Sequence, residues 1–167
     1  AQRYAADGSA LGGEFRVNES INGSQYQPEV TALAGGGFAV TWRNDNYDVS
    51  GTGSYQDVYV REYDAAGAAL GGQVKVNTPT PTQTSQYEPA IASLPDGGFV
   101  VAWRSDSQDG SSAGIYAQRY GADGAAMGGE FQVNTSTASN QYEPAVVGLT
   151  DGSFVVAYRR DYTAATS

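Results

Sequence analysis

The sequence contains three copies of one unit, and this internal repetition limits the possible folds more than any other feature. One segment recurs with few differences at Ala1–Asn18, Val60–Asn77 and Ala117–Asn134. A second recurs between these copies, at Ser24–Asp45, Ser85–Asp106 and Asn140–Asp161. Tyr4 and Tyr63 are 59 residues apart, and Tyr63 and Tyr120 are 57 apart. We therefore expect a single repeat domain over residues 1–167, with repeats of roughly 1–59, 60–116 and 117–167.

Each unit is predicted to form four short strands joined by turns. In the first complete unit these are Pro28–Leu33, Phe38–Arg43, Val58–Tyr63 and Gln73–Asn77, and the earlier copy of the fourth is Glu14–Asn18. Gly-rich and Asp-Gly turns, which are typical of hairpins, separate the strands. No segment shows the sustained apolar period of 3.6 residues that indicates a helix. The predicted class is all-β.

The second strand of each unit indicates how the sheets are arranged. Phe99–Trp103 is apolar on both faces, and Phe38–Trp42 and Phe154–Tyr158 are similar. A strand that is apolar on both faces must be covered on both faces. Stacking of successive four-stranded sheets, as in a β-propeller, provides this cover. A β-trefoil or β-prism, each of which also uses three four-stranded repeats, is the alternative.

The composition excludes several classes of protein. The chain has no Cys and no His, so a disulfide, a thiolate nucleophile, a Ser-His-Asp triad and a Cys/His zinc site are all excluded. Eighteen acidic residues against nine basic ones give a net charge of −9, which makes nucleic acid an unfavourable partner. No stretch reaches the roughly 18 apolar residues of a membrane span. Such an acidic, soluble surface favours a secreted or cell-surface protein.

The repeat resembles the tandem repeats of large secreted, calcium-associated bacterial proteins of the hemolysin or adhesin type. The resemblance rests on the Asp-Gly-Gly-Phe-Val-Val-Ala-Trp segment at 96–103, on Ile115–Gly124, and on the Gly-Gly-Glu-Phe-Gln-Val-Asn segment at 128–134. It implies that each repeat is one propeller blade with strands A to D. The chain then comprises C-D, A-B-C-D, A-B-C-D and A-B, which amounts to three blade equivalents. Propellers typically need four to eight blades, so we expect a homo-oligomer or neighbouring repeats of a longer chain.

Two repeated motifs fall on one face of such a propeller. The D-to-A loop ends in Gln-Tyr-Gln/Glu-Pro, and an Arg closes each B strand. An aromatic ring beside amide and carboxylate groups could hold a glycan or a protein surface. Alternatively, each Tyr packs between blades, and each Arg pairs with Glu29, Glu88 or Glu143. The candidate ligand-binding residues are Gln25, Tyr26, Arg43, Gln86, Tyr87, Glu88, Arg104, Gln141, Tyr142, Glu143 and Arg159.

The B-to-C loops could hold calcium, which prefers six to eight oxygen ligands. The candidate metal ligands are Asp45, Asp48, Asp106, Asp109 and Asp161. Their spacing matches neither the EF-hand nor the nonapeptide calcium repeat, and solvated turns capped by Asp are the competing interpretation.

The sequence favours an extracellular, non-catalytic module for adhesion or for glycan or protein binding. Its acids recur equivalently in each unit, whereas a catalytic centre is normally unique, so no catalytic residue is predicted. A structural protein that self-assembles into rings or filaments is the main alternative. A hydrolase acting on polysaccharide is a more remote one.

Overall fold

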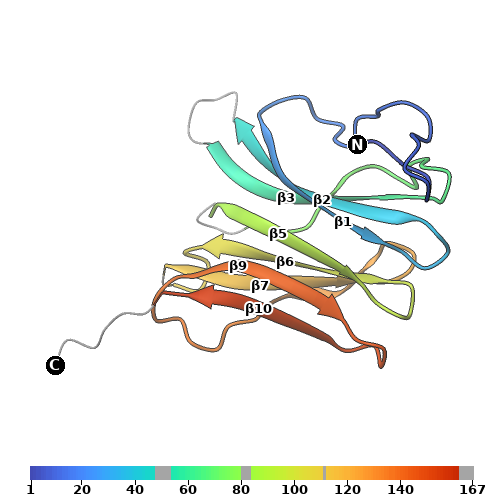
Figure 1. The fold of residues 1–167 in the computed structure, drawn as a ribbon. Helices are drawn as coiled ribbons and strands as arrows, with labels where there is room; N and C mark the ends of the chain where they lie inside the picture. Colours follow the sequence, from blue (N-terminus) through green and yellow to red (C-terminus); the bar gives the residue numbers. More distant parts are fainter. Residues whose placement is uncertain (48–53, 80–83, 111, 162–167) are drawn as a thin grey trace.

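The computed structural model describes residues 1–47, 54–79, 84–110 and 112–161. These residues form strands, turns and loops and contain no helix, which confirms the all-β class (Figure 1). The strands are β1 (Gln25–Ala32), β2 (Phe38–Tyr47), β3 (Ser54–Tyr63), β4 (Val74–Lys75), β5 (Gln86–Ser93), β6 (Phe99–Asp106), β7 (Ala113–Tyr120), β8 (Ala126–Gln132), β9 (Gln141–Gly148) and β10 (Phe154–Arg160). The described residues therefore include no helix that could cross a membrane.

The described strands belong to several antiparallel sheets that follow one another along the chain. The first sheet has the order β1-β2-β3-β4, the second has the order β5-β6-β7-β8, and the third pairs β9 with β10. In each sheet, neighbouring strands are consecutive in sequence and antiparallel. Figure 1 shows the three sheets as successive layers, with the first sheet at the top and the third at the bottom.

The turn between the first two strands of each sheet is tight and polar. In the second sheet, the Leu94 N–H donates to the Gly98 carbonyl, and the Gly97 N–H donates to the Leu94 carbonyl. Gly97 has φ of 90°, a left-handed value that favours glycine. The same two hydrogen bonds recur at Leu33 and Leu149. The Gly-rich and Asp-Gly segments therefore form the hairpin turns that the sequence predicts.

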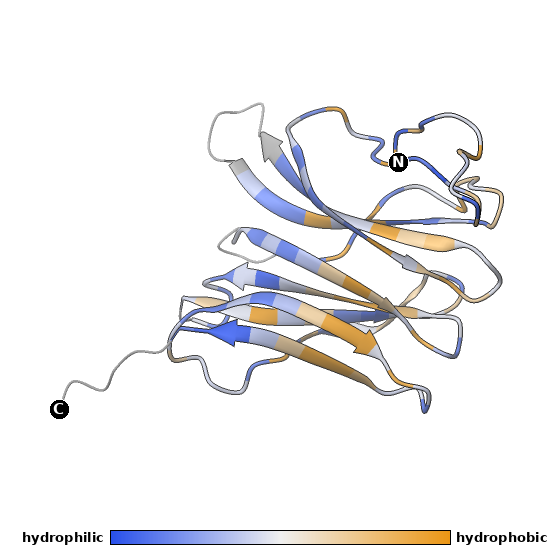
Figure 2. Cartoon of the chain, in the orientation of Figure 1, coloured by the Kyte–Doolittle hydropathy of each residue, from blue (hydrophilic) through white to orange (hydrophobic). Residues whose placement is uncertain are grey.

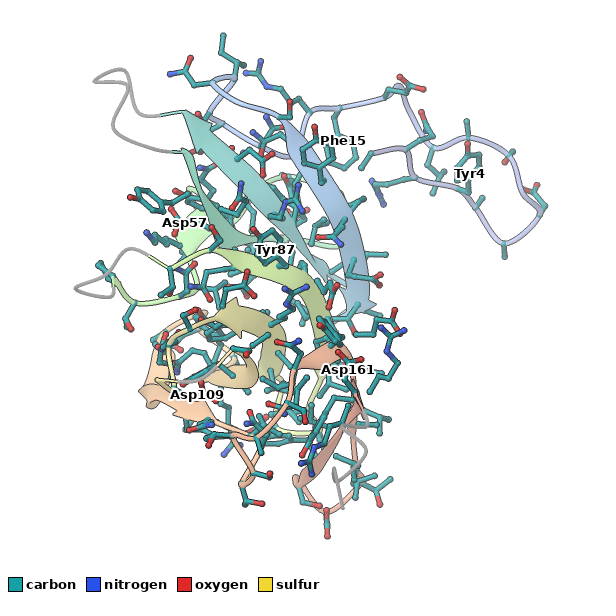
Figure 3. The ribbon with its side chains drawn as sticks, turned by 90° about the vertical axis from the view of Figure 1, so that its left-hand side faces the viewer. Tyr4, Phe15, Asp57, Tyr87, Asp109 and Asp161 are labelled. Atoms are coloured by element: carbon teal, nitrogen blue, oxygen red, sulfur yellow. The ribbon has the colours of Figure 1, made fainter. Side chains whose placement is uncertain are left out.

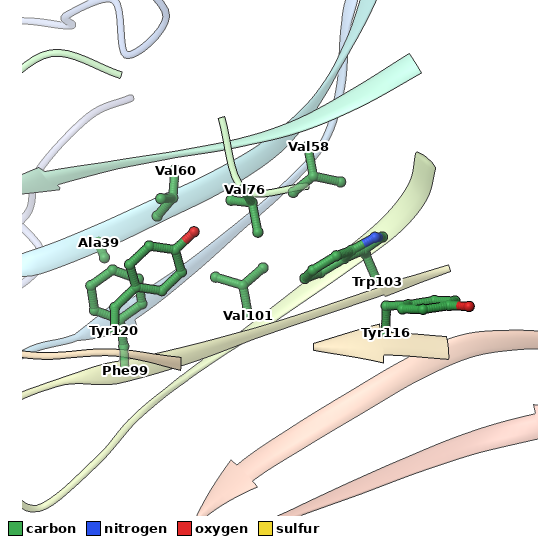
Figure 4. Close-up of a cluster of buried hydrophobic side chains, with 9 residues drawn as sticks. All are labelled: Ala39, Val58, Val60, Val76, Phe99, Val101, Trp103, Tyr116 and Tyr120. Carbon is green, nitrogen blue, oxygen red and sulfur yellow. The ribbon is translucent and has the colours of Figure 1, made fainter. Parts of the chain in front are cut away.

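Apolar side chains fill the spaces between sheets. One cluster lies between the first and second sheets and comprises Ala39, Val58, Val60, Val76, Phe99, Val101, Trp103, Tyr116 and Tyr120 (Figure 4). A second cluster joins the other face of the second sheet to the third sheet, through Val100 and Ala102 against Val146 and Val156. Figure 2 shows that apolar residues occur in strands of each layer. Both faces of β6 are thus covered, as its sequence requires.

Residues 1–18 lie against the outer face of the first sheet. Phe15 and Val17 contact the cluster of Val40, Trp42 and Tyr63. The segment folds back on itself through a bridge between Tyr4 and Ala10 and through the Phe15 N–H, which donates to the Ala1 carbonyl. The predicted fourth strand at Glu14–Asn18 is wrong, since no strand is assigned there. A short pairing that lacks a second neighbouring strand does not extend into a ladder.

The hairpin between β2 and β3 is longer than the sequence predicts. Pairing continues beyond Arg43, with Asn44 opposite Asp57 and Asp45 opposite Gln56. In the second sheet, pairing likewise runs to Asp106, which lies opposite Ala113. Asp45 and Asp106 therefore belong to strands, and the loops that follow them begin later than expected.

Candidate functional site

Three Tyr and three Arg side chains form an alternating stack along one end of the sheets. In every sheet the strand register places the Tyr opposite the Arg: Tyr26 pairs with Arg43, Tyr87 with Arg104, and Tyr142 with Arg159. We call these six residues the Tyr–Arg ladder. Figure 3 shows Tyr87 at the junction of the first and second sheets.

Each internal Arg of the ladder contacts two rings, one in its own sheet and one in the next. The Arg43 guanidinium lies 4.6 Å from the centroid of the Tyr26 ring and 5.3 Å from that of Tyr87. Arg104 lies 5.1 Å from Tyr87 and 4.7 Å from the Tyr142 ring. Arg159 ends the ladder, 5.2 Å from Tyr142. These distances are within the range of cation–π attraction, so the ladder joins all three sheets.

The Arg residues of the ladder are also paired with acids. Arg43 forms an ion pair of 3.0 Å with Asp45, and Arg104 forms one of 2.8 Å with Asp106. Glu88 lies 3.8 Å from Arg104, and Glu143 lies 3.3 Å from Arg159. The predicted pairing with Glu88 and Glu143 is therefore observed. The predicted role of Glu29 is not, because Gln27 occupies the corresponding place and Arg43 pairs with the acid two residues further along its own strand.

A β-bulge before each proline adds hydrogen bonds between sheets. Gln27, Glu88 and Glu143 have φ near 52°, although none is glycine. This left-handed backbone costs about 1–2 kcal/mol per residue. The bulge directs the Glu88 N–H to Gln27 Oε1 of the preceding sheet, at 3.1 Å. In the same way, the Glu143 N–H donates to Glu88 Oε2 at 2.7 Å. The inter-sheet contacts of the ladder offset the backbone strain.

A Gln residue precedes each Tyr of the ladder. Gln86 is buried, and its Oε1 accepts a hydrogen bond of 2.9 Å from Trp103 Nε1. Gln141 is also buried, and its Nε2 donates to the Ser139 carbonyl at 2.7 Å. Gln25 instead donates from Nε2 to Asn44 Oδ1 at 2.8 Å. These amides therefore make internal contacts, a function that the sequence does not reveal.

A small cavity lies at the outer end of the ladder, next to the first sheet. Its volume is about 120 Å³, and its lining residues are Val17, Asn18, Gln25, Tyr26, Pro28 and Trp42. The buried Trp42 Nε1 and Gln25 Oε1 have no hydrogen-bond partner within the described part of the chain. In the second sheet, the equivalent pair, Trp103 and Gln86, bond directly to each other.

The described candidate metal ligands do not converge on one point. Asp45 and Asp106 pair with Arg residues, Asp109 Oδ2 accepts a hydrogen bond from Gln132 Nε2 at 3.2 Å, and Asp161 Oδ2 accepts one from Asn140 at 3.5 Å. Asp48 lies outside the described residues. Within the described ranges, no group of three or more acidic side chains is placed to hold a metal ion. Calcium binding therefore remains a prediction from sequence.

At the opposite end of the sheets, two acids from neighbouring sheets face each other. Burial of the Glu62 side chain, together with the negative charge of Asp123, raises the pKa of Glu62 above its ordinary value of 4.5. In the second sheet, the corresponding residue is Arg119, which forms an ion pair with Asp96. Glu62 is thus an acid at a position where the neighbouring sheet has a base.

Replacing Glu62 with glutamine is expected to stabilise the protein near neutral pH. A raised folded-state pKa means that neutral Glu62 favours the folded state below pH 4.5, and that this contribution is lost as the pH rises through the folded-state pKa. The E62Q variant should therefore melt about 1–3 °C higher at neutral pH. It should show no gain in acid, where both proteins carry a neutral group. Equal gains at both pH values, or the same gain from exposed Glu14→Gln, would contradict this account.

Comparison with known proteins supports the fold and not an activity. The sequence matches no protein-family model, and no curated protein matches it. A solved structure named Hadza microbial sialidase Hz136 is similar, with a TM-score of 0.58 at 13% sequence identity. The alignment covers 80% of this chain and 32% of that one, so the chain spans about a third of that protein. The likeness concerns the all-β arrangement of several antiparallel sheets.

Proposed function

We propose that this chain is a non-catalytic scaffold, in which repeated side chains join consecutive sheets into a stack. The observation that carries this proposal is the Tyr–Arg ladder. The sequence allows its six residues either a packing role or a ligand-binding role, and in the structure they contact one another across both joints between sheets. A residue used in the same internal way in every repeat serves assembly of the fold. The scaffold then presents its loops to partners.

The stack is best described as propeller-type. Each complete unit is a four-stranded antiparallel meander, and successive units meet face to face through apolar clusters. This order corresponds to blades with strands A to D, and it favours three blade equivalents over a β-trefoil or β-prism. The similar sialidase structure supports the same assignment.

The setting we propose is extracellular, with a role in adhesion or in binding glycans or proteins. The net charge of −9 and the resemblance to repeats of secreted calcium-associated proteins support it. Asp45, Asp106 and Asp161 recur at the same place in each unit, whereas a catalytic centre is normally unique, which argues against the alternative of a polysaccharide hydrolase. The melting temperature of chelator-treated protein should rise when calcium is added if the metal binds. An unchanged melting temperature would contradict calcium binding.

A substitution at Tyr87 distinguishes a scaffold from a ligand site. Tyr87 contacts both Arg43 and Arg104, so Tyr87→Leu should cost about 1–3 kcal/mol of unfolding free energy. Tyr87→Phe retains the aromatic face and should cost less than about 1 kcal/mol. Chemical denaturation measures both. If Tyr87→Leu were as stable as the wild type, the ring would be free for a ligand and the scaffold proposal would fail.

A second candidate function is glycan binding at the cavity beneath Tyr26. Its support is the pairing of an aromatic wall with two buried polar atoms, Trp42 Nε1 and Gln25 Oε1, that have no partner among the described residues. A sugar hydroxyl could satisfy both atoms. Fluorescence of a Trp103→Phe variant reports on Trp42 alone. Saturable quenching by members of a glycan panel would support this candidate, and the absence of any response would exclude it.

A further inference from the structure

The outer faces of the first and third sheets resemble the two faces that meet at each joint inside the stack. In the internal joint between the second and third sheets, Val100 of one sheet faces Val146 of the next. The equivalent of Val100 on the outer side of the third sheet is Val155, which is 49% exposed. The equivalent of Val146 on the outer side of the first sheet is Val30, which is 65% exposed. Each outer surface therefore carries the apolar side chain that the other would cover.

The ends of the Tyr–Arg ladder are complementary in the same sense. One end is Tyr26, which is 45% exposed, and the other is Arg159, whose side chain is 58% exposed. In the internal joints, an Arg lies over the Tyr of the following sheet, at 5.3 and 4.7 Å. Arg159 is therefore placed to cover the Tyr26 ring of another copy. The Glu143 carboxylate would then accept the Gln27 N–H, as Glu88 accepts that of Glu143.

The strand edges are complementary as well. β6 pairs with both β5 and β7, whereas in the described residues β10 pairs only with β9. Residues 1–4 have the sequence Ala-Gln-Arg-Tyr, which is identical to residues 117–120 of β7. Their local hydrogen bonds match too: Gln2 Nε2 donates to the Arg3 and Gly12 carbonyls, and Gln118 Nε2 donates to those of Arg119 and Gly128. Residues 1–4 thus share their sequence and the Gln side-chain hydrogen bonds with the part of β7 that pairs with β6.

We propose that these surfaces bind a second copy of this chain head to tail, so that two chains close a ring of six sheets. Within the ring, β10 of each chain pairs with residues 1–4 of its partner, in the register that β6 and β7 use. Val155 then lies opposite Arg3 of the second copy, as Val100 lies opposite Arg119. Six sheets are within the four to eight that propellers use. The inference rests on the proposed scaffold, because it extends the same joint to a second chain.

Ser153 limits how far this new ladder extends. The corresponding residue of the second sheet is Gly98, where a Cβ would lie 2.2 Å from the Tyr120 carbonyl oxygen of β7. The Cβ of Ser153 would approach the Tyr4 carbonyl of the second copy in the same way. Ser153 therefore keeps the two strands further apart at this end than Gly98 keeps β6 and β7. It follows that Ser153→Gly should strengthen the association.

The molecular mass in solution tests the proposal. Sedimentation equilibrium should give twice the chain mass of 17.4 kDa. Val155→Asp places a charge in the joint and should weaken the association about 100-fold. Losses of this size are typical when a buried central residue of an interface is replaced. Met127→Asp is the matched control, since Met127 is 48% exposed on β8, away from both outer surfaces, and should leave the mass unchanged. Ser153→Gly should lower the dissociation constant.

A mixing experiment tests the head-to-tail geometry. Val30→Asp and Val155→Asp each damage one surface, so a mixture of the two variants retains one intact joint per pair. Partial recovery of the dimer on mixing, with each variant alone monomeric, is the expected result. A folded wild-type monomer at all concentrations would overturn the inference and leave the scaffold intact. A mass that grows without limit would overturn the closed ring. By contrast, failure of the scaffold appears in the Tyr87 variants, which report on stability.

Discussion

Replacing Arg104 with alanine is expected to lower the free energy of unfolding by about 2–4 kcal/mol, because the central rung of the ladder holds two sheets together. Arg104 contacts the rings of Tyr87 and Tyr142 and pairs with Asp106. Its removal eliminates both ring contacts and leaves Asp106 and Glu88 without their shared cation. Urea denaturation, followed by tryptophan fluorescence, measures the loss.

Two further variants identify the cause of that loss. Arg104→Lys keeps the charge but lacks the planar guanidinium, so its stability should lie between those of the wild type and Arg104→Ala. Arg16 is exposed and is not part of the ladder, so Arg16→Ala should change stability by less than about 0.5 kcal/mol. Equal losses from Arg104→Ala and Arg16→Ala would show that the ladder contributes nothing to stability.

Replacing Gly98 with alanine is expected to cost about 2–3 kcal/mol, because the added methyl group has no space. Its Cβ would lie 2.2 Å from the Tyr120 carbonyl oxygen and 3.2 Å from the Gly121 carbonyl carbon. Both are backbone atoms at the end of β7 or just after it, so relief requires β6 and β7 to separate at this end. The melting temperature should fall by roughly 4–10 °C.

The control for this variant is Gly129→Ala. Gly129 has no neighbouring heavy atom within 4 Å of the ideal Cβ position and has no left-handed backbone, so alanine should be tolerated there. A Gly98→Ala protein as stable as Gly129→Ala would mean that β6 and β7 do not approach each other as described.

The sequence predicts the strands and the joints between sheets because both depend on apolar periodicity. Phe99–Trp103 is apolar at every position, and the structure covers both of its faces. Packing of the Tyr residues between sheets is one of the two interpretations that the sequence allows, and the ring contacts of Tyr87 favour it. These features depend on the burial of apolar side chains, which the pattern of apolar residues in one sequence indicates directly.

The sequence does not predict contacts that depend on backbone geometry. The left-handed φ of Glu88 is a case in point, since a residue before proline normally prefers an extended conformation. The pairing of Arg43 with Asp45 depends on a hairpin longer than its turn residues indicate. Likewise, Glu14–Asn18 has the composition of a strand, but a strand also requires a neighbour along its length.

Because the same side chains are used at each joint, the chain can gain or lose whole repeats. Arg43 contacts Tyr87 in the same way that Arg104 contacts Tyr142. Each joint therefore has an Arg guanidinium on one side and a Tyr ring on the other. A duplicated unit of about 58 residues would find a matching surface on either side without any new substitution. Gene duplication and deletion can therefore add or remove whole layers, while each boundary between layers stays chemically unchanged.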